Sequence, residues 1–349
     1  MADQLELAAE KAGKGELVAK TVRDIINEIQ VKSGCSPFQD VSTEGWFRSW
    51  LRNKRSSTAE SSQLRYTATI DEFLEFIGKR SLKSIQLLSV DDIIEFRDYL
   101  EASGIAAKSV RMALKVLRAC LGAAVNQGLR VHNPAMGVEL PNGRSLKKRF
   151  FSAEQVDLLL DHAPDREWHR LIRLAYYTGA RLGDLKDLRR SEIDLVRRIL
   201  TFTPKKQRRS KEPESLTIPL HPDVIGDLGD LDPTSEYIFP TLSKKSVGGK
   251  TGLSLTFRGI IDAAGIPYES CLPKGPRGRR VYSLGFHSLR RTFNSLLANA
   301  NVPQEIRKKL VGQASDEVND MYTDFQTQTL RDAVHRLPSV GQPTKLPTD

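Results

Sequence analysis

The stretch TGARLGDL occupies residues 178–185 and places Arg181 where a glycine-containing turn opens a short helix. It follows a helical pattern in which Leu171, Leu174 and Ala175 are apolar. Downstream, residues 199–203 and 215–220 are rich in β-forming side chains and predict two strands. This part of the chain is therefore expected to be mainly helical with a small antiparallel sheet.

Apolar residues recur at helical spacing on both sides of this stretch. Residues 40–132 predict a compact bundle of about four helices, and further helices are expected over 253–264, 287–299 and 303–310. Ser89 and Asp92 predict a capping box ahead of one helix of the bundle, and Ser152 is placed to cap the first helix of the second domain. We expect a helical leader at 1–39, a helical bundle at 40–132, a basic linker at 133–150, a second domain at 151–337 and a flexible tail at 338–349.

The last helix of the bundle, predicted over 108–127, has two faces. Its apolar face carries Val110, Leu114 and Leu117, among others. A second stripe is basic and comprises Lys108, Arg111, Lys115 and Arg118. Such a stripe is usually a solvated helix face, yet in a basic chain it is also a candidate for contact with DNA phosphates. The linker adds three basic candidates, Lys147, Lys148 and Arg149.

The overall charge supports a polyanionic partner. The 349 residues carry a formal net charge of +10, which favours nucleic acid over a membrane. The three cysteines are far apart and lack metal-ligand spacing, so neither a disulfide framework nor a metal site is expected. No apolar run approaches a membrane-spanning length, and a cytoplasmic location is expected.

Cutting DNA without a metal requires cations for the phosphate oxygens, a nucleophile and a proton donor for the leaving oxygen. The sequence offers such groups in order along its second half. They are Arg181, Asp184, Lys205, Lys206, His287, Arg290, Gln313 and Tyr322. Each residue alone has an ordinary structural explanation, such as a helix-start ion pair for Arg181 or a hydrogen-bonded core-edge hydroxyl for Tyr322.

The ordered set resembles the tyrosine recombinases of the phage-integrase class. Residues 178–185 are similar to the first signature box of that family, 287–293 to its His-x-x-Arg box, and 312–322 to the segment ending at its nucleophile. Residues 133–141 resemble its hinge. The resemblance covers roughly residues 40–337, and four motifs in the family's order over this length make it specific.

The resemblance implies a role for each matching residue. Arg181 and Arg290 would bind the scissile phosphate, with Asp184 bracing Arg181. His287 would orient the phosphate and assist proton transfer, and Tyr322 would attack to give a 3′-phosphotyrosine. A hairpin lysine would protonate the 5′-oxygen; Lys206 is preferred and Lys205 is the rival. No cofactor is implied, because the phosphotyrosine conserves the bond energy.

Two positions depart from the family pattern. Gln313 stands where the family usually has His or Trp, and Gln can donate a hydrogen bond but carries no charge. Losing one such donor costs about 10²–10³ in rate in related chemistry. Arg291 stands where a second His is common and adds a cation instead.

The resemblance also implies assembly on DNA into dimers and then a tetramer. The DNA-binding bundle at 40–132 and the catalytic domain at 151–337 of each chain are expected to form a C-shaped clamp around a DNA duplex. The apolar residues Leu330, Ala333, Val334 and Leu337 predict a final helix that docks on a neighbouring protomer or packs on its own domain. Two other functions stay open: a DNA-binding protein that has lost catalysis, and an enzyme that relaxes DNA as type IB topoisomerases do. A metal-dependent nuclease is disfavoured, since no cluster of metal-binding carboxylates or His and Cys ligands occurs.

Overall fold

The computed structural model describes residues 6, 9–10, 12–13, 19–32, 41–143, 146–205, 207–208, 213–229, 231, 234–272, 276–277, 279–313 and 325–341. Two of the predicted site residues, Lys206 and Tyr322, lie outside these ranges. The chain forms two compact units. Unit 1 comprises residues 1–145 and 272–279, and unit 2 comprises 146–271 and 280–349. The domain boundaries predicted from the sequence remain predictions at the level of single residues.

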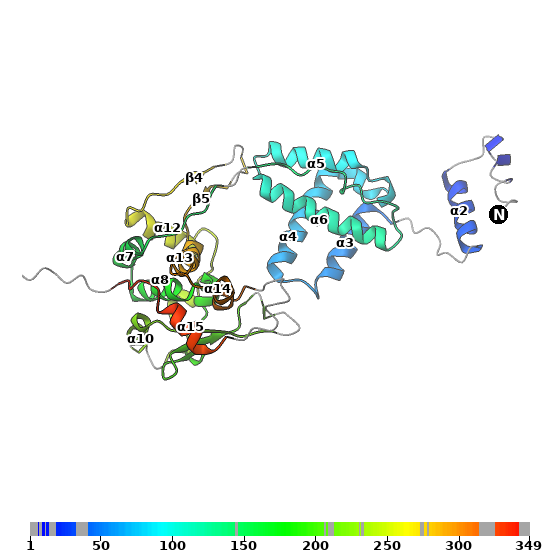
Figure 1. Cartoon of the computed structure of the whole chain (residues 1–349). Coiled ribbons are helices and arrows are strands. Elements are labelled where there is room, and N and C mark those ends of the chain that lie inside the picture. Colours follow the sequence, from blue (N-terminus) through cyan, green and yellow to red (C-terminus); the bar gives the residue numbers. More distant parts are fainter. Residues whose placement is uncertain are drawn as a thin grey trace, which may run out of the picture. The chain divides into compact units, whose positions relative to one another are not determined.

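Unit 1 contains a bundle of helices formed by α3 to α6 (Figure 1). Its elements are α2 (Ala19–Lys32), α3 (Thr43–Lys54), α4 (Glu60–Ile77), η1 (Gly78–Leu82), η2 (Ile85–Leu87), α5 (Val90–Ala102) and α6 (Ala107–Asn126). The predicted capping box at Ser89 and Asp92 is confirmed at the start of α5. The long helix predicted over 108–127 is α6, and Gly128 follows it with a φ of 71°.

Aromatic rings fill the centre of this bundle. The rings of Phe73 and Phe96 meet edge to face with centroids 5.1 Å apart, and both side chains are fully buried. Trp46 donates its indole hydrogen to the carbonyl of Cys120 on α6 at 3.1 Å. These contacts join α3, α4, α5 and α6, so the apolar faces read from the sequence do form one core.

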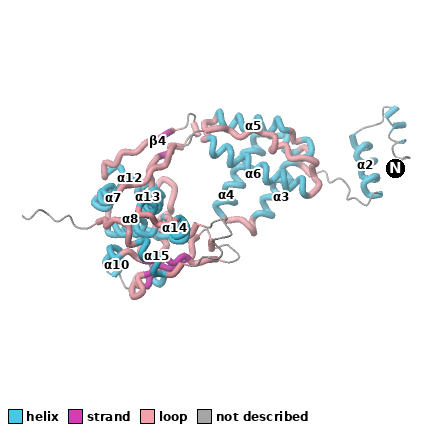
Figure 2. The backbone as a smooth tube through the Cα atoms, viewed as in Figure 1, coloured by secondary structure: helices cyan, strands magenta, loops and turns pink. Residues whose placement is uncertain are grey.

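Unit 2 is mainly helical and also holds every named strand of the described chain (Figure 2). Its helices are α7 (Ala153–Asp161), α8 (Arg166–Thr178), α9 (Leu182–Leu185), η3 (Arg190–Glu192), α10 (Pro222–Gly229), α11 (Pro240–Ser243), α12 (Leu253–Ala263), α13 (His287–Asn299), α14 (Gln304–Val311) and α15 (Thr327–Val334). Its strands are β1 (Ile193–Asp194), β2 (Ile199–Phe202), β3 (Leu216–Pro219), β4 (Ser270–Cys271) and β5 (Val281–Tyr282). The predicted fold class is confirmed: mainly α, with small antiparallel sheets.

The sheet and helix α8 organise unit 2. Strands β1, β2 and β3 form an antiparallel sheet in sequence order, with Leu200 opposite Ile218. The C-terminal half of α8 is buried on all sides and packs against α7, α10 and α13. Ser152 and Gln155 form a capping box at the start of α7, as predicted for Ser152. Pro303 is the N-cap of α14 rather than its first helical residue.

The end of the chain differs from the expected flexible tail. Val340 is 1% exposed, and its backbone amide donates to the hydroxyl of Tyr177 at 2.9 Å. The amide of Gly341 donates to Asp157 at 2.7 Å. Residues 338–341 are therefore a packed part of unit 2, and 342–349 lie outside the described residues. No helix in the described part of the chain is long and apolar enough to cross a membrane.

Candidate active site

Arg181 occupies the turn between α8 and α9. Gly179 ends α8 in the left-handed conformation with a φ of 61°, and Arg181 is the extended N-cap of α9. A Cβ atom at Gly179 would lie 2.7 Å from the ring of Phe293 on α13. Only glycine fits this position, so the predicted glycine-containing turn has a steric cause. The turn leaves the Arg181 side chain 37% exposed, where it can reach a ligand.

Asp184 braces this turn from one helical turn away. Its carboxylate lies 3.9 Å from the Arg181 guanidinium and is 6% exposed. The other carboxylate oxygen accepts the backbone amide of Lys205 at 2.9 Å. Asp184 therefore joins the first arginine to the start of the loop that holds the two candidate lysines.

Arg290 joins three segments that are distant in sequence. One guanidinium nitrogen donates to the carbonyl of Gly179 at 2.9 Å, and another donates to the carbonyl of Val311 at 2.7 Å. Burial lowers the pKa of Arg290 to about 10, and the nearby charge of Arg181 adds to this shift. Arg290 still carries its charge at neutral pH, so the two guanidinium groups form one cationic cluster.

His287 begins α13 one helical turn before Arg290. Partial burial lowers its pKa below the ordinary value, and the charges of Arg290, Arg291 and Arg181 act in the same direction. A histidine with a lowered pKa is neutral at pH 7 and can accept a proton or a hydrogen bond.

Gln313 follows the C-terminal end of α14. Gly312 ends that helix in the left-handed conformation with a φ of 59°, and the amide of Gln313 donates to the carbonyl of Lys308. The Gln313 side chain is exposed, two residues after the Val311 carbonyl that Arg290 binds. The structure thus brings Arg181, Asp184, Lys205, His287, Arg290 and Gln313 together from four separate motifs.

Two neighbours of this cluster, the acidic Asp187 and the basic Lys186, were not predicted from the sequence. Asp187 accepts a hydrogen bond from Lys186 at 2.5 Å and forms an ion pair with Lys205. Burial opposes ionisation of Asp187, yet the hydrogen bonds from the two lysines dominate and lower its pKa. The signal in the sequence was the spacing of three between Asp184 and Asp187, which places both carboxylates on one side of the turn.

The basic stripe on α6 divides in the structure. Arg111 donates to the carbonyl of Pro141, and Arg118 donates to the carbonyls of Ala135 and Val138. These two arginines therefore hold the chain after α6 against that helix. Lys115 is exposed, and Lys108 lines a 460 Å³ hollow with other basic side chains.

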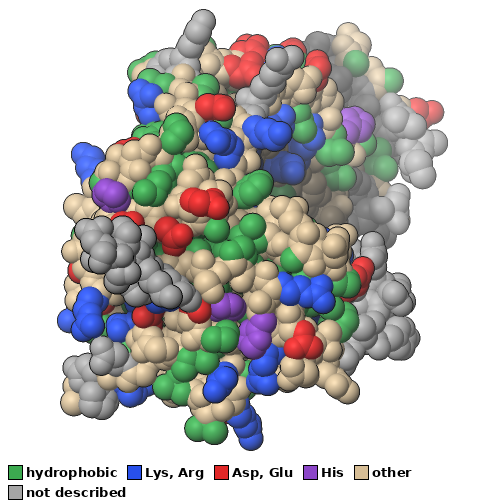
Figure 3. Space-filling view, turned by 60° about the vertical axis from the view of Figure 1, so that its left-hand side comes forward, with side chains coloured by type: hydrophobic (Ala, Val, Ile, Leu, Met, Phe, Trp, Pro, Cys, Tyr) green, Lys and Arg blue, Asp and Glu red, His purple; other side chains and the backbone are tan. Residues whose placement is uncertain are grey.

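The linker lysines and arginine lie at the start of unit 2. Lys147 is exposed, Lys148 donates to the carbonyl of Tyr282, and the amide of Arg149 donates to the carbonyl of Ser283 at 2.9 Å. The face of the molecule in Figure 3 mixes basic and acidic side chains and carries no continuous basic field.

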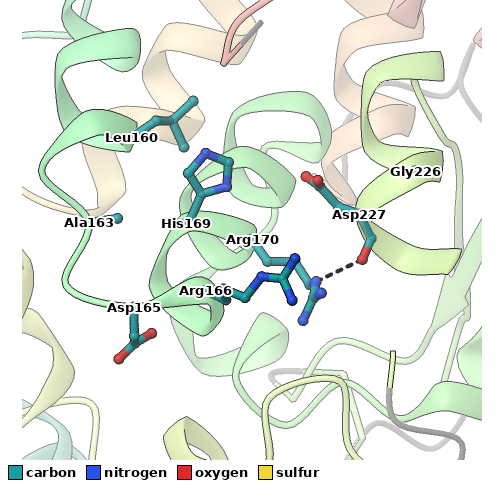
Figure 4. A pocket seen from close by; sticks show the side chains of 8 residues that line it. All are labelled: Leu160, Ala163, Asp165, Arg166, His169, Arg170, Gly226 and Asp227. Atoms are coloured by element: carbon teal, nitrogen blue, oxygen red, sulfur yellow. Dashed lines mark hydrogen bonds between the residues drawn. The ribbon is translucent and has the colours of Figure 1, made fainter. Parts of the chain in front are cut away.

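A 520 Å³ pocket in unit 2 lies away from these residues (Figure 4). It is lined by the first half of α8, with His169 and Arg170, and by Asp227 of α10. Arg170 donates to the Asp227 carbonyl at 2.9 Å, and the Asp227 carboxylate pairs with Arg173 at 3.1 Å. Because Arg181 follows the opposite end of α8, this pocket is not part of the candidate active site.

Comparisons with known proteins agree with the geometry. Residues 149–329 match the phage integrase family, and residues 45–139 match the phage integrase SAM-like domain. The tyrosine recombinase XerD of Rickettsia conorii is 20% identical over 299 residues, covering 80% of this chain and 93% of the relative.

Solved structures show the same fold. A lambda integrase dimer bound to a COC' core site superposes with a TM-score of 0.64 at 17% identity, covering 96% of this chain and 87% of that chain. The Tn1549 transposon integrase in complex with transposon right end DNA gives a TM-score of 0.62 at 15% identity, covering 85% and 99%.

Proposed function

Since the chain belongs to the phage integrase family, we propose that it is a site-specific DNA recombinase that cuts and rejoins strands through a 3′-phosphotyrosine on Tyr322. One observation carries the catalytic part of this proposal. Arg290 on α13 is bonded to Gly179, two residues before Arg181, so two guanidinium groups meet beside His287. Such a cluster suits the non-bridging oxygens of a phosphodiester, on which negative charge grows in the transition state.

The cleavage step exchanges one phosphoester bond for another. The Tyr322 hydroxyl oxygen bonds to phosphorus, and the bond between phosphorus and the 5′-oxygen breaks. His287, which is neutral, accepts the phenolic proton, and a lysine ammonium protonates the departing 5′-oxygen. Arg181 and Arg290 hold the non-bridging oxygens throughout. Religation reverses these transfers with a new 5′-hydroxyl as the nucleophile.

We now propose Lys205 as the proton donor, in place of Lys206, which the sequence pattern favoured; the reason is the set of contacts that Lys205 makes. The Asp184 carboxylate fixes the Lys205 backbone next to Arg181. The Lys205 ammonium forms an ion pair with Asp187, three residues after Asp184. Lys206 lies outside the described residues.

Double-stranded DNA is the substrate, and unit 1 supplies a second DNA-binding surface. The exposed Lys108 and Lys115 of α6 are our candidates for phosphate contacts on unit 1, and Lys147 is a separate candidate on unit 2. The relatives include a dimer on its core site and a tetramer on a Holliday junction, and we propose the same assembly here. Helix α15 packs against β3 of its own unit, so docking on a neighbour would require it to move. A cytoplasmic location is our proposal, because the protein would act on DNA there.

Gln313 supports a second candidate function. Its uncharged side chain removes one cation from the phosphate site of the family, as expected for a DNA-binding protein with weakened catalysis. The cluster of Arg181, His287 and Arg290 weighs against this alternative, because DNA binding alone does not require a neutral histidine beside two arginines.

A plasmid assay separates these functions. The substrate is a supercoiled plasmid that carries two copies of the sequence flanking the gene in direct orientation. A recombinase resolves it into two smaller circles, whereas a topoisomerase-like enzyme only relaxes it. The Tyr322→Phe variant is the control and should give neither product while still binding DNA. If the wild type binds the plasmid but neither resolves nor relaxes it, our proposal is wrong and the protein binds DNA without cutting it.

A further inference from the structure

Asp187 makes contacts that a solvated surface carboxylate would not need. One oxygen accepts from the Lys186 ammonium at 2.5 Å, and the other pairs with the Lys205 ammonium. Its side chain is 24% exposed, and that of Lys186 is 11% exposed. Lys186 is itself fixed, because it also donates to the carbonyl of Ser243 at 2.7 Å. Lys186 therefore holds the Asp187 carboxylate in a fixed position.

Two carboxylates of one short segment hold the same lysine. Asp184 accepts the Lys205 backbone amide at 2.9 Å, while Asp187 binds the ammonium at the end of the same side chain. The first contact fixes the backbone from which the Lys205 side chain extends, and the second contact fixes the position of its ammonium group. A flexible four-carbon stem is thus ordered at both ends, which lowers the entropy cost of presenting its proton.

The exposure of Lys205 explains why a second carboxylate is needed. Each carboxylate that contacts Lys205 also contacts a second cation: Asp184 lies 3.9 Å from the Arg181 guanidinium, and Asp187 accepts from the Lys186 ammonium. Asp184 is already engaged with Arg181 and the Lys205 amide. The Lys205 side chain is 40% exposed, so without the Asp187 contact its ammonium would be free to turn into solvent.

From these contacts we propose that Asp187 is a positioning residue for the proton donor: it holds the Lys205 ammonium at the edge of the Arg181–Arg290 cluster, from which the lysine protonates the leaving 5′-oxygen. The inference rests on the proposed recombinase function. It assigns no direct contact between Asp187 and DNA, because its two oxygens are occupied by lysines.

A leaving-group substitution tests this proposal. In one nicked suicide substrate the scissile 5′-oxygen is replaced by sulfur, which departs as a stable thiolate and needs no proton. The rate of covalent adduct formation is measured on the oxygen and sulfur substrates for the wild type, Asp187→Asn, Asp187→Glu, Lys205→Ala and Lys206→Ala. Asp194→Asn is the matched control, since Asp194 is an ion-paired aspartate on β1 of the same unit, 41% exposed at its side chain.

We expect Lys205→Ala to lose roughly 10²–10⁴-fold on oxygen. Asp187→Asn should lose about tenfold, since the donor is displaced rather than removed. Sulfur should restore both variants to the wild-type rate, Asp187→Glu should recover part of the loss on oxygen, and Asp194→Asn should match the wild type on both substrates.

Three results would overturn the proposal. An equal loss on oxygen and sulfur would make Asp187 merely structural. An unchanged or faster rate on oxygen for Asp187→Asn would mean that the ion pair does not serve the donor. Rescue of Lys206→Ala instead of Lys205→Ala would make Lys205 an anchor only. A wild type that forms no adduct on either substrate would instead refute the proposed function itself.

Discussion

Replacing Gly179 by alanine should damage the fold and the active site together. The glycine has a φ of 61°, where a residue with a side chain loses about 1–2 kcal/mol. The new Cβ would meet three atoms of Phe293 at 2.7, 3.0 and 3.3 Å. Phe293 is fully buried and cannot swing away, so overpacking adds about 1–3 kcal/mol. We therefore expect the free energy of unfolding to fall by about 2–5 kcal/mol.

The assay is equilibrium urea unfolding of the full chain, with hydrogen exchange of the α8 and α13 amides to assign the loss to unit 2. Gly259→Ala is the control, because Gly259 lies inside α12 with no atom within 4 Å of a new Cβ. That variant should gain about 0.5–1 kcal/mol from better helix propensity. Adduct formation by Gly179→Ala should also drop, since the Gly179 carbonyl holds Arg290. Equal stability of the two variants would refute this reasoning.

Four further predictions concern the site and the DNA. Arg290→Lys should slow adduct formation by roughly 10²–10³-fold, because lysine cannot bridge two carbonyls and still bind a phosphate; a rate within threefold of the wild type would contradict this. His287 must be neutral to accept a proton, so adduct formation should fall as pH drops through its lowered pKa; Arg291→Gln removes one of the charges that lower this pKa, and should move that acid limb to higher pH. Gln313→His should speed adduct formation about tenfold or more, and no gain would mean that Gln313 does not limit the rate. Binding measured from 50 to 200 mM salt should weaken by about 10³-fold or more, and a flat dependence would exclude contact with many phosphates.

Much of the fold could be predicted because local signals agreed with tertiary structure. The helix predicted over 108–127 is α6, and the two strands predicted over 199–203 and 215–220 are β2 and β3. These segments have long apolar faces or dense β-formers, which packing then uses. The short helix α9 was predicted from the glycine-containing turn before it, whereas the strands β1, β4 and β5 escaped prediction, because two residues carry no periodicity.

The residues of the candidate site could be predicted from the sequence for a different reason. Arg181, His287 and Arg290 were found from motif order, and the structure supplies the cause of their proximity in the bonds of Arg290 to Gly179 and Val311. Sequence spacing could not reveal that Asp187 holds Lys205, because the contact joins residues 18 positions apart through side chains alone.

The basic stripe on α6 shows the limit of charge patterns. Arg111 and Arg118 have the same spacing as Lys108 and Lys115, yet the two arginines bind carbonyls of residues 135–141. Their partners lie 17 to 30 positions away and follow a turn that periodicity does not describe.

Identifying the residue that becomes linked to DNA tests the central claim most directly. The wild type is incubated with a nicked suicide substrate and quenched with detergent, and the covalent product is digested and sequenced by mass spectrometry. Our account predicts a nucleotide 3′-phosphate attached to Tyr322, and no adduct from the Tyr322→Phe variant. An adduct on another residue, or an undiminished adduct in Tyr322→Phe, would contradict it.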